Sequence, residues 1–217
     1  MSKLHAPYDI CVIDIGSPKL GNLGWCLLDA RSGHEHTGFH LDDLFPHIKN
    51  ALEKNALILG LEAPLFVPLR TDLMLATKAR KGEGRRPWSA GAGAQVLAMN
   101  MPIMAYLFKG IGAACPDVSW HLNEQTFTAQ QGHIMIFEAL VSGADKGTSH
   151  INDAQIMAQY CKGHSLGHSL PPSILEHEEG VAYFNLAAAA LMRCGMGSSE
   201  TLLECHTPIY KPTGPMR

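Results

Sequence analysis

The chain of 217 residues lacks several features that mark common classes of protein. Its six cysteines include no CxxC pair and no closely spaced framework, which argues against a disulfide-stapled secreted domain and favours a reducing compartment. No run approaches the roughly 18 apolar residues of a membrane span, and residues 1–9 contain no apolar signal-peptide core. The formal net charge of −3 excludes a uniformly basic protein that coats nucleic acid, but it does not exclude a local basic patch. We therefore expect a cytoplasmic protein with no membrane partner.

The residues that are present have the composition of an ordinary globular domain. Hydrophobic residues make up 46% and charged residues 17% of the chain, which is enough apolar material for a sizeable core. A chain of this length forms one large domain or two small ones, and we find no internal repeat and no linker. We therefore expect residues 1–217 to form a single α/β domain.

Apolar runs and turn residues predict the order of the elements. Strands are expected at 8–14 and 22–30, joined as an antiparallel hairpin because the link holds two glycines and a proline. Apolar residues at helical spacing predict a helix over 41–52, with Pro46 tolerable only in its first turn. The remaining expectations are a third strand near 34–40, strands at 56–64 and 133–140, helices at 94–109 (interrupted or kinked at Pro102), 148–162 and 184–194, a loop at 163–180, and a tail that is irregular or a short edge strand.

Carboxylates occupy comparable places in four of these elements. Three apolar runs carry one at or near their C-terminal end, and a fourth lies near a helix start: Asp14, Glu62, Glu138 and Asp153. Each alone could be a turn or cap residue. In open α/β sheets, however, functional sites gather at the carboxyl ends of the strands, and clustered carboxylates raise one another's pKa. A divalent cation removes that conflict, and carboxylate-bound Mg²⁺ or Mn²⁺ commonly drives phosphodiester hydrolysis.

The motifs "VIDIGS", "GLEAP" and "HINDA" resemble, in this order, those of the ribonuclease H-like superfamily, and in particular its predicted-nuclease branch related to Holliday-junction resolvases. The resemblance covers residues 8–162. It implies an α/β fold with a ribonuclease H-like mixed sheet, its first three strands antiparallel, flanked by helices. It implies a metal-dependent nuclease in which Asp14, Glu62 and Asp153 bind Mg²⁺ or Mn²⁺ and Glu138 joins them as a catalytic acid. The segment "VSGADKGTSH" departs from the family pattern, and resolvase-like relatives make a homodimer one expectation.

A basic segment follows the strand that ends at Glu62 and forms a loop insertion near 69–93. We predict that its cations and one aromatic residue bind nucleic acid: Arg70, Arg80, Lys81, Arg85, Arg86 and Trp88. Arginine and lysine neutralise phosphates, and an aromatic ring can stack on a base. We expect this loop on the same face as the acids, although a plain solvated loop is the alternative. The sequence does not distinguish DNA from RNA.

Other interpretations of these residues remain open. "GHSLG" matches the nucleophile elbow of α/β hydrolases with Ser165 as nucleophile, but the motif needs a preceding strand and a following helix, and two prolines follow it. A zinc site is conceivable at Cys161, His164, His168 and His177. "DIGSPKLG" is similar to the phosphate-binding hairpin of actin-like ATPases, which need two such domains. The main alternative to a nuclease is a non-catalytic module of the same fold that binds nucleic acid or a protein partner.

Overall fold

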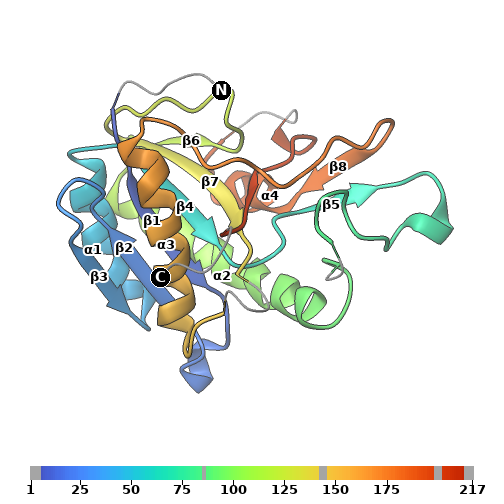
Figure 1. Ribbon diagram of the computed structural model, residues 1–217, viewed down its shortest axis with the longest axis horizontal. Helices are drawn as coiled ribbons and strands as arrows, with labels where there is room; N and C mark the ends of the chain where they lie inside the picture. Colours follow the sequence, from blue (N-terminus) through green and yellow to red (C-terminus); the bar gives the residue numbers. More distant parts are fainter. Residues whose placement is uncertain (1–5, 85–86, 142–145, 198–201, 213–217) are drawn as a thin grey trace.

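The computed structural model describes residues 6–84, 87–141, 146–197 and 202–212 (Figure 1). Its strands are β1 (Asp9–Asp14), β2 (Gly24–Leu28), β3 (Glu35–Gly38), β4 (Leu57–Leu61), β5 (Phe66–Leu69), β6 (Ser119–His121), β7 (His133–Ala139), β8 (Ala182–Asn185) and β9 (Ile209–Tyr210). Its α-helices are α1 (Leu41–Leu52), α2 (Ala92–Ala114), α3 (His150–Leu166) and α4 (Leu186–Arg193), and its short 3₁₀ helices are η1 (Pro18–Leu20) and η2 (Leu73–Leu75).

The described strands form one mixed sheet of seven strands and a separate pair. The large sheet has the order β3-β2-β1-β4-β7-β6, and β9 also pairs with β7. Strands β1, β2 and β3 pair antiparallel with one another, whereas β1 pairs in parallel with β4, and β7 pairs in parallel with β4, β6 and β9. This confirms the expected mixed sheet with three antiparallel strands at its start. It also places the carboxyl ends of β1, β4 and β7 at the same edge.

Helices cover both faces of the sheet. Alternate residues of β1 belong to two different clusters of buried side chains, because side chains along a strand alternate between faces. Cys11 and Ile13 pack in the cluster that includes α1, α2 and α4, and Ile10 and Val12 pack in the cluster that includes α3. Figure 1 shows α3 lying across β1 and β2 on one side of the sheet, with α1 and α2 on the other. Burial on both faces explains why the interiors of the central strands are mostly apolar.

Two helices continue through a proline. Pro46 lies beyond the first turn of α1, and Pro102 lies inside a 23-residue α2 rather than interrupting it. Each proline removes one backbone hydrogen bond. Buried apolar residues on both sides of each proline offset that loss, such as Leu44 and Ile48 in α1.

Helix α2 also bears on the expectation that no segment could span a membrane. By length and composition alone, it is apolar enough to cross one. In the described structure it packs against α1 and α4 and buries Ile103, Met104, Leu107, Phe108 and Ile111.

The structure contains a two-stranded sheet that the sequence did not predict. Strand β5 pairs antiparallel with β8, and the pair lies beside the large sheet, next to η2 (Figure 1). Residues 184 and 185 were expected at the start of a helix. Instead they end β8, and the Asn185 side chain accepts a hydrogen bond from the Ala188 N–H as the N-cap of α4.

Candidate metal centre

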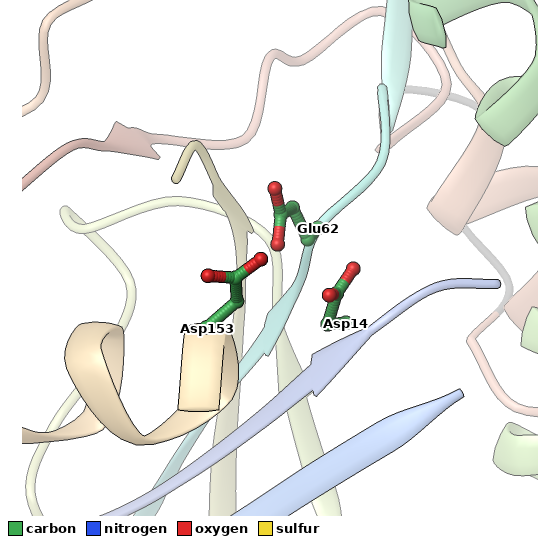
Figure 2. Close-up of side chains that lie close together, drawn as sticks. All are labelled: Asp14, Glu62 and Asp153. Atoms are coloured by element: carbon green, nitrogen blue, oxygen red, sulfur yellow. The ribbon is translucent and has the colours of Figure 1, made fainter. Parts of the chain in front are cut away.

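Three of the four predicted acids converge at the carboxyl edge of the large sheet (Figure 2). Asp14 is the last residue of β1, Glu62 directly follows β4, and Asp153 lies in the first turn of α3. One ligand atom from each lies within 4.8 Å of the others. Metal–oxygen bonds of roughly 2.0–2.6 Å allow two ligands of one ion to be about 4–5 Å apart, so the three carboxylates are close enough to share a cation.

Strand pairing brings the first two acids together. In the parallel ladder, Ile13 pairs with Leu61, and the Glu62 N–H donates a 2.9 Å hydrogen bond to the Ile13 carbonyl. Asp14 and Glu62 are the next residues after this pair, so they lie beside each other at the end of the ladder. Because side chains alternate between faces, they emerge on the same face of the sheet.

The start of α3 supplies the third acid. Ser149 caps the helix, its hydroxyl accepting from the Asn152 N–H at 3.2 Å. Asp153 accepts a 2.5 Å hydrogen bond from the Gly147 N–H. A carboxylate in the first turn of a helix is also favoured by the helix dipole. Local capping therefore fixes Asp153 beside the sheet edge.

Two groups that the sequence reasoning missed contact the acids. His150 Nδ1 lies 2.5 Å from Asp14 Oδ2. Lys146 Nζ lies 3.8 Å from Glu62 Oε1 and 3.5 Å from Asp153 Oδ2. The motif "HINDA" could have identified His150, because His150 precedes Asp153 by three residues and therefore lies on the same side of the helix as Asp153. No sequence pattern pointed to Lys146.

The electrostatics of the cluster favour a bound cation. Burial, followed by the charge of Asp14, raises the pKa of Glu62 to about 9. Burial also raises the pKa of Asp14, although His150 opposes that shift. Glu62 Oε2 is buried and has no hydrogen-bond partner among the described residues. Three carboxylates with an unpartnered oxygen form a donor set of the type that Mg²⁺ or Mn²⁺ prefers.

Glu138 does not join this cluster. It pairs with Leu61, one position before Glu62, so its side chain points to the opposite face of the sheet. Its oxygens accept hydrogen bonds of 2.6 and 2.8 Å from Arg80, and one also accepts from the Leu65 N–H. The expectation of a fourth acid beside the other three is therefore not met. The strand register places Glu138 on the other face of the sheet, where it is the counterion of Arg80.

The same ion pair changes the interpretation of Arg80, which was predicted to contact phosphate. The side chain is buried and contacts Glu138, Glu83 at 2.8 Å and the Phe66 carbonyl at 3.2 Å. A guanidinium with these partners is not exposed to a nucleic acid. The prediction for Arg80 is wrong because its charge is used inside the protein.

Two further predicted cations also have acidic partners. The buried Arg70 side chain pairs with Glu178 at 2.9 Å, and its guanidinium donates to three carbonyls within 75–79. This residue shapes the loop rather than facing solvent, so the phosphate-binding prediction for it is wrong. Lys81 is exposed and lies 3.3 Å from Glu176. Arg85 and Arg86 lie outside the described residues.

A cavity of about 510 Å³ opens beside Asp14 and Glu62, two of the three acids. Its lining includes Asp14, Glu62, Lys146 and His150, together with Trp88 and neighbouring residues before α2. Of the described lining residues, Glu83 alone falls within 70–86, and Arg80 lies with Glu138 on the opposite face of the sheet, so the expectation that the basic loop shares the face of the acids stays a prediction.

The structure also bears on the alternative sites. Ser165 lies in α3, where its hydroxyl is buried, accepts from the Tyr8 N–H at 2.8 Å and donates to the Tyr8 carbonyl at 2.6 Å. It is therefore not placed as a nucleophile. Cys161 is buried in the core. Within the described ranges, the cluster of Figure 2 is the one group of three metal-ligating side chains, so the zinc alternative gains no support.

The chain matches no protein-family model, and no curated protein or solved structure is significantly similar to it.

Proposed function

We propose that the protein is a divalent-metal-dependent nuclease that hydrolyses phosphodiester bonds, on a ribonuclease H-like fold. The observation that carries the proposal is the convergence of Asp14, Glu62 and Asp153 within 4.8 Å, from three elements distant in sequence. The mixed sheet with three antiparallel strands at its start supports the proposed fold.

The roles of the residues follow from their contacts. Asp14, Glu62 and Asp153 would hold Mg²⁺ or Mn²⁺, and such an ion would supply an activated water and stabilise charge on a phosphoryl group. His150 contacts the Asp14 carboxylate through Nδ1 and so orients it. Lys146 is half-exposed at the cavity and offers its ammonium to the acids or to a phosphate oxygen.

We predict that the Asp14→Asn variant folds, because it relieves like-charge repulsion between buried carboxyls, but that it loses Mn²⁺ binding in a calorimetric titration. Cleavage of labelled DNA and RNA should require Mg²⁺ or Mn²⁺, stop in EDTA and fall at least about 100-fold in the variant, as expected when a metal-activated water is lost.

Asp117→Asn is the matched control, since Asp117 is an exposed aspartate outside the cavity. It should bind Mn²⁺ and cleave like the natural chain. Cleavage that persists in EDTA, or equal Mn²⁺ binding by the Asp14 variant, would contradict the proposal.

The non-catalytic alternative rests on Lys146. Its ammonium already balances Glu62 and Asp153, so the cluster could persist without a metal. Binding of nucleic acid or a protein partner without saturable Mn²⁺ binding and without cleavage would favour that module over a nuclease.

A further inference from the structure

We infer that the cavity beside the candidate metal centre accepts one unpaired nucleotide, with its base against Trp88 and its phosphate toward Asp14, Glu62 and Asp153. This inference rests on the proposed function and narrows its substrate class. The nucleotide can belong to a single strand or be free, and both present the same base and phosphate to the cavity. An intact duplex does not offer an unpaired base.

The cavity has the size and the mixed polar and apolar lining that a nucleotide requires. Its volume of about 510 Å³ falls within the range of roughly 300–1,000 Å³ typical of small-molecule sites. The lining includes the carboxylates of Asp14 and Glu62, those of Glu83 and Glu138, which Arg80 balances, and apolar surface from Pro64, Trp88 and Val96. A base has apolar faces, and a phosphate binds a carboxylate-held cation, so one nucleotide matches this mixed lining.

Hydrogen bonds of Trp88 and Ser89 fix the position of the indole at the cavity. The indole Nε1–H donates to the Lys78 carbonyl at 3.3 Å, and the Ser89 hydroxyl donates to the Thr77 carbonyl at 2.5 Å. These contacts fasten the residues before α2 to the preceding part of the loop. The indole is half-buried, so it is held while still lining the cavity.

The charges around the cavity disfavour a duplex. Duplex binding depends on many lysine and arginine contacts to phosphates, yet the buried side chains of Arg70 and Arg80 are paired with carboxylates of the protein. Among the described residues that line the cavity, Lys146 supplies the one ammonium or guanidinium group. This distribution suits one phosphate at a metal better than a long phosphate backbone.

The test measures binding of adenosine monophosphate, which has no phosphodiester bond to cleave, by calorimetry with Mn²⁺ present. Trp88→Ala should weaken this binding roughly 5- to 150-fold, the range expected for one stacked base. Trp88→Phe should retain most of the affinity. Tyr106→Ala is the control, because Tyr106 is an exposed aromatic residue on α2 outside the cavity.

Ribose 5-phosphate isolates the contribution of the base. It should bind more weakly than adenosine monophosphate to the natural chain and equally to the natural chain and the Trp88→Ala variant. Removing the base and removing the indole should thus not be additive, because both delete the same contact. If Trp88→Ala fails to fold, Val96→Trp provides a second route, since it should fill the apolar part of the cavity and block the nucleotide while Mn²⁺ still binds.

Competition against adenosine monophosphate identifies the source of the nucleotide. Stronger competition by a single-stranded oligonucleotide than by its duplex supports a strand substrate, and competition by free nucleotides alone supports a small-molecule substrate. Equal competition by duplex and single strand overturns the inference, as does unchanged binding by a folded Trp88→Ala variant that still binds Mn²⁺. Failure of the natural chain to bind Mn²⁺ instead counts against the proposed function itself, and the inference falls with it.

Discussion

The buried ion pair of Arg80 and Glu138 shows that a cation of the basic segment 69–93 can stabilise the fold without facing solvent. Arg80 donates to Glu138 through two nitrogens, at 2.6 and 2.8 Å, and also pairs with Glu83. Removing one member of such a pair leaves an uncompensated charge away from water, whereas a surface ion pair contributes little. The stability of the fold should therefore depend on this arginine much more than on neighbouring cations.

We predict that Arg80→Ala lowers the free energy of unfolding by about 3–5 kcal/mol. Lys81→Ala, which removes only the exposed contact with Glu176, should change it by less than about 1 kcal/mol. Urea denaturation followed by circular dichroism measures both. Equal effects of the two substitutions would mean that the buried pair has no special structural weight.

The sequence allowed prediction of the three acids but not of the ion pairs. Asp14 and Glu62 each end an apolar run, and that position in the chain reveals their place at the sheet edge. Arg70 and Arg80 also stand out as charges, but their partners Glu178 and Glu138 are 108 and 58 residues away. Only the tertiary structure shows that these cations are already occupied.

At the scale of the element, the approach of α3 to β2 sets the position of Asp153. A Cβ added to Gly24 would lie 2.4 Å from the Ile151 backbone nitrogen and 2.5 Å from the His150 backbone carbon. These distances are far shorter than normal contacts, so the glycine allows the first turn of the helix to lie directly on the strand. That turn carries His150 and Asp153 to the acids of β1 and β4.

We predict that Gly24→Ala displaces the start of α3 and weakens Mn²⁺ binding at least about tenfold, since metal sites depend on the precise placement of their ligands. Gly163→Ala is the matched control, because a Cβ at that position of the same helix meets nothing within 4 Å. It should leave Mn²⁺ binding unchanged and stabilise the helix by up to about 1 kcal/mol. Equal Mn²⁺ affinity of the two variants would show that the close packing does not position the site.

The elements themselves were predicted where the pattern was local. The hairpin of β1 and β2, the strands β4 and β7 and the helix α3 follow from apolar runs and caps in their own sequences. Strand β8 was not predicted, because its pairing with β5 joins segments more than a hundred residues apart. The unbroken course of α2 through Pro102 depends on packing against α1 and α4, which the local sequence does not contain.

At the scale of the molecule, the candidate metal centre lies where the sheet meets the helix that covers it. Asp14 and Glu62 come from the sheet, and Asp153 comes from α3. Among the described residues, Lys146 is the cation that contacts both Glu62 and Asp153. A divalent ion would join the two layers more firmly, because it would replace one ammonium contact by several metal–oxygen bonds.

Metal binding should therefore raise the thermal stability of the whole domain. A ligand that binds only the folded state at 100 times its Kd contributes about 2.7 kcal/mol, and 1 kcal/mol shifts Tm by roughly 2–4 °C in a domain of this size. We predict that saturating Mn²⁺ raises Tm by about 5–10 °C relative to EDTA, as measured by scanning calorimetry. Asp14→Asn should lose this shift and Asp117→Asn should keep it.

Lys146→Gln should lower Tm in EDTA but enlarge the shift with Mn²⁺, because the ammonium that balances the acids is gone and the metal takes over its role. A shift of the same size in Asp14→Asn would place the bound metal elsewhere in the protein.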